Sequence, residues 1–221
     1  MTRKAIVVGA TGLIGKELVQ LLLNDPAYTT VTVLARRTTG LTHSKLHEKI
    51  INFDDLQQID TNFTGADVFC TLGTTIKKAG SQDAFRQVDY SYPLTLGKMA
   101  KTKGAKQFLL ISSMGANPKS RAFYTHIKGE IEAALQQLAL PGLSIFRPSL
   151  LLGNRAEFRF GEVMAAMLSK PLSPLFIGPL RKYRPIQART VAKAMIYTAK
   201  RNQSGTHVYE SEQIAQMGEH S

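Results

Sequence analysis

The side chains best suited to proton transfer lie between positions 112 and 128. Ser112 and Ser113 end an apolar run, and Tyr124 and Lys128 follow 11 and 15 residues after Ser113. Residues four positions apart on a helix share a face, so we expect the Lys128 ammonium beside the Tyr124 phenol. A phenol of ordinary pKa, about 10, exchanges protons poorly at neutral pH unless a positive charge stabilises the phenolate. The spacing therefore predicts general acid–base chemistry at a Ser-Tyr-Lys site.

A glycine-rich segment near the start of the chain predicts a phosphate site. Residues 9–15 read Gly-Ala-Thr-Gly-Leu-Ile-Gly, directly after the apolar run 5–8 and at the start of a stretch with helical periodicity. Gly9, Gly12 and Gly15 would allow a tight turn, close approach of the backbone to a pyrophosphate, and close packing of helix on strand. Free amides at the helix N-terminus would then bind the phosphates. We predict dinucleotide binding here, with a purely structural turn as the alternative.

The second apolar run ends where the adenosine ribose of a bound dinucleotide would lie. Arg36 and Arg37 stand there instead of the carboxylate that holds the 2′-hydroxyl of NAD, so NADP(H) is the predicted cofactor. Two solvated arginines are the alternative. Gly73, after the fourth apolar run, would let the main chain run beside the nicotinamide ribose, unless it forms an ordinary turn. Asp54 would bond the adenine amino group or cap a helix.

Short apolar runs alternate with longer helical stretches, which is typical of βαβ units around a parallel sheet. We predict strands over 5–8, 31–35, 49–53, 68–72, 107–111, 143–146 and 207–210, and helices over 13–23, 84–103, 125–138 and 190–201. Pro93 is expected to kink the second helix. The predicted fold is a Rossmann-type, doubly wound α/β sheet in a single domain over residues 1–221. Prolines break up the chain after Arg147, which predicts a small C-terminal substrate cap over roughly 148–221.

The net charge of +12 would suit nucleic acid, an acidic membrane or an anionic ligand. Lysines and arginines stand singly or in pairs, with no run of five or more, which decides little between these partners. We expect ordinary solvated charge together with a phosphate-bearing cofactor, and a nucleic-acid surface is the less favoured alternative. Glu130 and Glu132 are expected on the solvated side of their helix. The oligomeric state, monomer or homodimer, stays open.

Cysteine usage and hydropathy predict a cytoplasmic protein that does not enter a membrane. Cys70 is the only cysteine, which excludes an internal disulfide and a cysteine metal cluster, and we expect no metal. Its apolar neighbours indicate a core position. Four apolar residues before Gly9 are too few for a signal peptide, and no apolar stretch approaches the roughly 18 residues of a spanning helix.

Taken in order along the chain, these motifs resemble the short-chain dehydrogenase/reductase superfamily. The resemblance is to its atypical, extended-like branch, and there to the small NADP(H)-binding oxidoreductases related to the human Tat-interacting protein. It runs from Lys4 to about Arg159. The matching segments are GATGLIG at 9–15, Arg36-Arg37, Leu72-Gly73-Thr74-Thr75, Lys78-Ala79-Gly80, Phe85-Arg86, Val88-Asp89, Ser112-Ser113, Tyr124, Lys128-Gly129-Glu130 and Phe146-Arg147-Pro148.

The resemblance implies a role for each member of the Ser-Tyr-Lys site. Tyr124 would be the catalytic acid/base, Lys128 would hold the nicotinamide ribose and tune the tyrosine, and Ser113, with Ser112 as the alternative, would position a carbonyl. It also implies cofactor contacts from Thr11, Gly12, Leu13, Ile14, Arg36, Arg37, Leu72, Gly73, Leu151 and Arg159. No counterpart of the classical relay asparagine is found, and the C-terminal region is short for a nucleotide-sugar pocket.

Two functions follow from these expectations. The first is an NADP(H)-dependent oxidoreductase that reduces a small carbonyl substrate. The second is a non-catalytic NADPH-sensing regulatory protein. An intact Ser-Tyr-Lys set favours the enzyme, because a pure sensor has no need of it.

Overall fold

The computed structural model describes residues 2–152 and 184–219, whose centre is a parallel sheet of seven strands. The strands are β1 (Arg3–Val8), β2 (Tyr28–Ala35), β3 (Leu46–Ile50), β4 (Asp67–Cys70), β5 (Gln107–Ile111), β6 (Gly142–Arg147) and β9 (Gly205–Glu210). They lie in the order β3-β2-β1-β4-β5-β6-β9, and each neighbouring pair is parallel. The strand order reverses between β1 and β4, which confirms the predicted Rossmann-type, doubly wound sheet.

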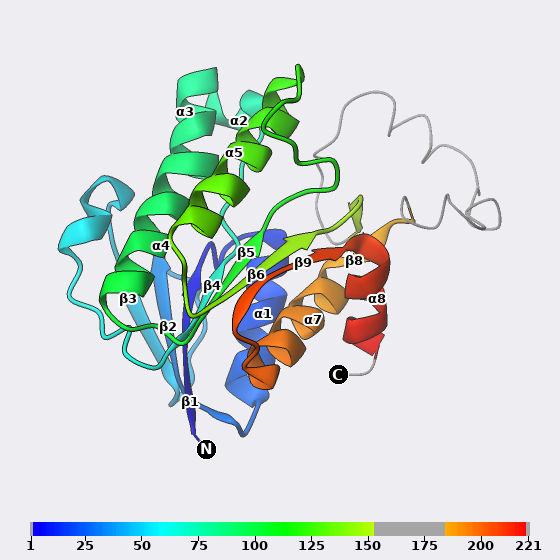
Figure 1. The fold of residues 1–221 in the computed structure, drawn as a ribbon. Helices are drawn as coiled ribbons and strands as arrows, with labels where there is room; N and C mark the ends of the chain where they lie inside the picture. The colour runs from blue at the N-terminus through cyan, green and yellow to red at the C-terminus, as the bar shows by residue number, and fades with distance from the viewer. Residues whose placement is uncertain (1, 153–183, 220–221) are drawn as a thin grey trace.

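Alternating side chains of the strands build two cores, one on each face of the sheet. On β1, Ala5 and Val7 join one core, and Ile6 and Val8 join the other. Helices α1 (Leu13–Asn24), α7 (Ala188–Arg201) and α8 (Ser211–Glu219) contribute to the first core. Helices α4 (Tyr92–Thr102) and α5 (Phe123–Gln137) contribute to the second, and the two layers flank the sheet in Figure 1. Parallel strands buried on both faces in this way read as continuous apolar runs, which is why the sequence revealed them.

The region between β2 and α4 departs from the predicted elements. β3 begins three residues before the predicted 49–53 strand and ends at Ile50, and Phe53 opens the 3-10 turn η1 (Phe53–Gln58). The helix predicted over 84–103 is divided into α3 (Gln82–Arg86), the π-helical turn η2 (Gln87–Ser91) and α4, and a short helix α2 (Ile76–Ala79) precedes them. Pro93 lies in the first turn of α4. Its missing N–H and its ring disturb the preceding turn, so the predicted kink takes the form of a π turn.

The last elements of the chain that the structure describes complete the sheet. β9 pairs with β6 as the seventh strand, and α7 shares a core with α1. The two short strands β7 (Leu151–Leu152) and β8 (Ile186–Gln187) pair with each other. The prediction of a cap over roughly 148–221 did not anticipate β9 in the sheet or α7 in this core, because prolines mark breaks in the chain and say nothing about where it returns to the sheet. For residues 153–183, which lie outside the described residues, the cap stays a prediction.

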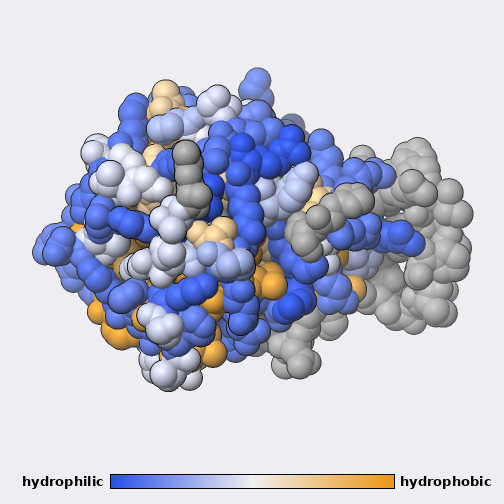
Figure 2. Space-filling view, turned by 90° about the horizontal axis from the view of Figure 1, so that it is seen from below, coloured by the Kyte–Doolittle hydropathy of each residue, from blue (hydrophilic) through white to orange (hydrophobic). Residues whose placement is uncertain are grey.

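The face of the molecule seen from below in Figure 2 is largely polar. Figure 2 shows the side on which the strands begin, where hydrophilic residues cover most of the surface and hydrophobic residues form small groups. Within the described ranges, no helix combines the length and apolar character needed to span a bilayer.

Candidate cofactor and active site

The glycine-rich segment forms a tight turn between β1 and α1. Gly9 has a φ of +91°, and a Cβ atom there would lie 2.7 Å from the main-chain carbonyl of Thr71. The Gly12 amide donates to the Gly9 carbonyl at 2.9 Å, which closes the turn. A Cβ atom on Gly15 would lie 2.2 Å from the Gly9 carbonyl oxygen. Gly9 and Gly15 are therefore required by the backbone itself, as the motif predicts.

Among the described residues, no side chain caps the N-terminus of α1. Gly12 occupies the N-cap position without a capping side chain, and the first turn holds no acidic residue. The side chain of Ile14 is buried in the core with Leu13 packed against it, so these two residues can reach a ligand through their backbone amides. Uncapped amides and the helix dipole together favour an anion at this point.

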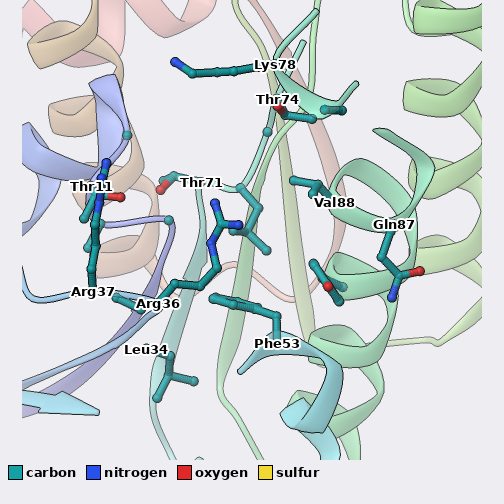
Figure 3. A pocket seen from close by; sticks show the side chains of 18 of the residues that line it. Thr11, Leu34, Arg36, Arg37, Phe53, Thr71, Thr74, Lys78, Gln87 and Val88 are labelled. Atoms are coloured by element: carbon teal, nitrogen blue, oxygen red, sulfur yellow. The ribbon is translucent and has the colours of Figure 1, made fainter. Parts of the chain in front are cut away.

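A cleft of about 730 Å³ opens at the carboxyl ends of β1, β2 and β4, where the strand order reverses. Its lining is Gly9, Ala10, Thr11, Gly12, Leu34, Ala35, Arg36, Arg37, Phe53, Thr71, Leu72, Gly73, Thr74, Lys78, Ala79, Ala84, Gln87, Val88 and Tyr92. Arg36, Arg37 and Lys78 bring three positive charges to it, and Figure 3 shows Arg36 and Arg37 on the side opposite Gln87 and Val88. This volume is in the range of small-molecule and cofactor sites.

One end of the cleft is bounded by aromatic rings that the sequence did not indicate. The rings of Phe53 and Tyr92 lie 5.3 Å apart, next to Arg36 in the lining. The Tyr92 hydroxyl donates to Asp54 at 2.7 Å, and burial together with this carboxylate raises the pKa of Tyr92. The Asp54 carboxylate is thus hydrogen-bonded to a tyrosine, and the side chain that caps the turn η1 is that of Asn52. A signal was present in the sequence, since the predicted third strand ended on an aromatic residue, Phe53.

The two serines at the end of β5 have different surroundings. The Ser112 hydroxyl donates to the buried carboxylate of Glu132, which also receives Arg147 at 2.5 Å. The Ser113 hydroxyl is equally buried, with the residue 2% exposed, and has no hydrogen-bond partner among the described residues. A buried hydroxyl without a partner costs free energy and is a group that a ligand can satisfy. Of the two serines, Ser113 alone has its hydroxyl available in the described structure.

Glu132 was placed on the solvated face of its helix, and this prediction is wrong. Its residue is only 2% exposed, and its carboxylate joins α5 to Arg147 on β6. Arg147 also reaches Glu210 on β9 at 3.0 Å. These hydrogen bonds and charges raise the pKa of Arg147 and keep it protonated. The burial results from the approach of β6, which helical periodicity within α5 cannot reveal.

Tyr124 and Lys128 lie one turn apart in the first half of α5, as predicted. The half-buried Tyr124 ring packs 5.7 Å from the ring of Phe85, which is fully buried. The Lys128 ammonium is almost fully buried and lies 2.8 Å from a carboxylate oxygen of Asp89. Gly129, the next residue, allows the loop at Asn117 and Pro118 to approach, since a Cβ atom there would lie 2.1 Å from the Pro118 nitrogen.

The other predicted site residues fall into three groups. Leu72 and Gly73 line the cleft together with Thr11 and the two arginines. Leu151 is half-buried in β7, and neither it nor the Ser113, Tyr124 and Lys128 set is among the described residues lining the cleft. Arg159 lies outside the described residues.

Cys70 occupies the core position expected of it. It is fully buried at the end of β4, and this burial raises the pKa of its thiol to about 12.

The sheet, the glycine turn and the cleft define a Rossmann-type dinucleotide-binding protein. A family model described as NAD(P)H-binding matches residues 9–140, more than half of the chain. Protein HTATIP2 of Rattus norvegicus is 38% identical over 167 residues, which cover 74% of this chain and 69% of the relative. Protein FMP52, mitochondrial, of Candida albicans is 34% identical over 205 residues, or 90% of this chain and 89% of the relative. The chain therefore belongs to the NAD(P)H-binding, atypical branch of the short-chain dehydrogenase/reductase superfamily that includes these two relatives.

The solved structures agree on the fold. A short chain dehydrogenase family protein from Francisella tularensis has a TM-score of 0.64 at 17% identity, covering 98% of this chain and 100% of that one. At this identity the likeness concerns the fold alone.

The predicted cytoplasmic location is contradicted by the names of the relatives. The Candida albicans relative is named a mitochondrial protein, and so are further fungal relatives called FMP52. The prediction rested on a missing secretory signal and missing apolar spans, and those features do not separate the cytosol from the mitochondrion.

Proposed function

We propose that the protein is an NADP(H)-dependent oxidoreductase that reduces a small carbonyl compound with Ser113, Tyr124 and Lys128. The observation that carries the cofactor assignment is the cleft at the strand reversal, with an uncapped helix N-terminus on one side and Arg36 and Arg37 beside it. The amides at the start of α1 suit a pyrophosphate, because the helix has no capping side chain among the described residues and no acidic residue in its first turn.

At the adenosine end, the arginines would provide specificity for the 2′-phosphate. Both are exposed at the end of β2, and both line the cleft. A guanidinium matches the geometry of a phosphate better than that of a ribose hydroxyl. The neighbouring Phe53 side chain offers an apolar surface for the adenine ring, and NADPH is the form that this arrangement favours.

When bound, NADPH supplies the hydride that is added to the carbonyl carbon of the substrate. The Tyr124 hydroxyl would donate the proton that the carbonyl oxygen takes up, so the product is an alcohol. The Ser113 hydroxyl would donate a hydrogen bond to the same oxygen as negative charge develops on it, which gives this buried group its partner. Lys128 would stabilise the phenolate left behind on Tyr124 until a proton from solvent restores it.

One observation favours the alternative, a non-catalytic NADPH-sensing protein. The Lys128 ammonium already pairs with the Asp89 carboxylate, so its charge is partly neutralised before any cofactor arrives. In a sensor this ion pair would only stabilise the structure around the cleft. The two functions share the cofactor site and differ in whether the bound cofactor transfers its hydride to a substrate.

The experiment that tests the enzyme is a screen for turnover with a panel of aldehydes, ketones and quinones. Oxidation of NADPH is followed by absorbance, and the product is identified as the corresponding alcohol or hydroquinone. The chain has no tryptophan, so the fluorescence of bound NADPH can be read against a weak tyrosine background in the same samples. Turnover of a panel member supports the oxidoreductase. Tight NADPH binding without turnover of any member supports the sensor.

A further inference from the structure

A buried carboxylate links the cofactor cleft to the helix that holds Lys128. One oxygen of Asp89 lies 2.8 Å from the Lys128 ammonium, and the other accepts the main-chain amide of Thr74 at 2.8 Å. Asp89 is 1% exposed, and the Lys128 side chain is 5% exposed. Three segments that are distant in sequence, the loop after β4, the turn η2 and helix α5, therefore meet at one side chain.

The π-helical turn explains how Asp89 reaches this position. η2 spans Gln87–Ser91, and both Gln87 and Val88 line the cleft while Asp89 is buried behind them. A π turn adds one residue to the helical turn and rotates the following side chain, and such turns occur often at functional sites. Thr74, whose main-chain amide donates a hydrogen bond to Asp89, itself lines the cleft.

A purely structural role is an incomplete explanation for this ion pair. Replacing a buried ion pair by apolar residues is often neutral or stabilising, so stability alone gives little reason for it. The pair does fix the position of the ammonium at the end of a long, four-carbon side chain. It also makes that position depend on the loop that borders the cleft.

We propose that Asp89 is a positioning residue, which holds the Lys128 ammonium for the nicotinamide ribose of the cofactor and ties it to the cleft loop through the Thr74 amide. This inference rests on the proposed function, because it assumes that the nicotinamide half lies on the side of Lys128 and the 2′-phosphate on the side of Arg36 and Arg37. Asp89 acts through Lys128 and takes no part in proton transfer itself.

The test compares two ligands with the full chain. Asp89→Asn keeps the size of the side chain and an oxygen for the Thr74 amide but removes the charge that holds Lys128. NADPH affinity is measured by fluorescence, and the affinity of 2′,5′-ADP, the adenosine half alone, by calorimetry. We expect the dissociation constant of NADPH to rise about tenfold or more, as for loss of a charge-assisted contact, and that of 2′,5′-ADP to stay within about twofold. Asp83→Asn, which removes an exposed acid from α3, is the matched control and should change neither.

The outcomes separate this inference from the proposed function. If Asp89→Asn weakens both ligands equally, or neither, Asp89 is structural and the inference is wrong. If the wild-type protein fails to bind 2′,5′-ADP, the proposed NADP(H) site is wrong, and the inference falls with it. Should Asp89→Asn fail to fold, Lys128→Gln is compared with the double variant Asp89→Asn with Lys128→Gln, which leaves no unpaired buried charge. If Asp89 acts through Lys128, both variants bind NADPH equally weakly, and a further loss of NADPH affinity in the double variant contradicts the inference.

Discussion

Replacing both Arg36 and Arg37 by alanine is expected to remove the preference for NADPH over NADH and to leave the affinity for NADH nearly unchanged. The two side chains stand at the carboxyl end of β2 and line the cleft. The only chemical difference between the two cofactors is the 2′-phosphate. The double substitution should therefore weaken the binding of NADPH and leave the binding of NADH unchanged.

The size of the effect follows from the exposure of the two arginines. A hydrogen bond to a charged group contributes about 1.5–3 kcal/mol. Because both side chains are exposed, water and salt screen them, and the lower end of this range applies. At about 1.4 kcal/mol for each factor of ten, two contacts correspond to about a 100-fold preference for NADPH in the wild type.

Calorimetry with both cofactors measures the preference directly. The control replaces Lys98 and Lys101, two exposed lysines of α4 outside the cleft lining, by alanine, which gives the same change in net charge. It should keep most of the preference, and raising the salt concentration should lower the wild-type preference. Equal affinities of the wild type for NADPH and NADH would refute the reasoning, as would a preference that survives in the double arginine variant.

Three further predictions concern the turn, a buried ion pair and the thiol. Gly12→Val should abolish NADPH binding and leave the circular dichroism spectrum intact, because the Gly12 φ of −76° suits any residue. Gly15→Ala should instead destabilise the fold itself, and the reverse pattern would mean that the phosphate site is misplaced. Glu132→Ala should lower the free energy of unfolding by about 1–3 kcal/mol, because the buried Ser112 hydroxyl loses its acceptor and Arg147 keeps only Glu210; an unchanged midpoint in denaturant titration would contradict this. Cys70 should resist alkylation at pH 8 until the protein unfolds, because a pKa raised to about 12 keeps the buried thiol protonated, and rapid labelling seen by mass spectrometry would disprove it.

The sequence predicted the sheet well because local pattern and global fold agree there. The apolar runs of β1, β5 and β6 are buried on both faces, and within the glycine turn Gly9 has a φ of +91° while Gly15 lies against the Gly9 carbonyl. The first half of α5 was also predictable, since Tyr124 and Lys128 are related by helical geometry alone. In each case a single short segment contains the information.

The features that sequence analysis missed depend on segments meeting in three dimensions. Glu132 becomes buried because Arg147 approaches from β6, and Asp89 becomes a link because both Thr74 and Lys128 reach it. Neither encounter leaves a periodicity in the sequence. The motif match at Val88-Asp89 was the only signal, and it gave no role for the carboxylate.

The most direct test of the central claim, carbonyl reduction at a Ser-Tyr-Lys site, compares the wild type with Tyr124→Phe on a substrate found in the panel. Phenylalanine keeps the ring and its packing on Phe85, so the hydroxyl is the only group lost. We predict unchanged NADPH affinity and a rate of NADPH oxidation that falls roughly 100- to 10,000-fold, which is the usual contribution of general acid catalysis. A Tyr124→Phe variant that reduces the same substrate at the wild-type rate would contradict the proposed mechanism.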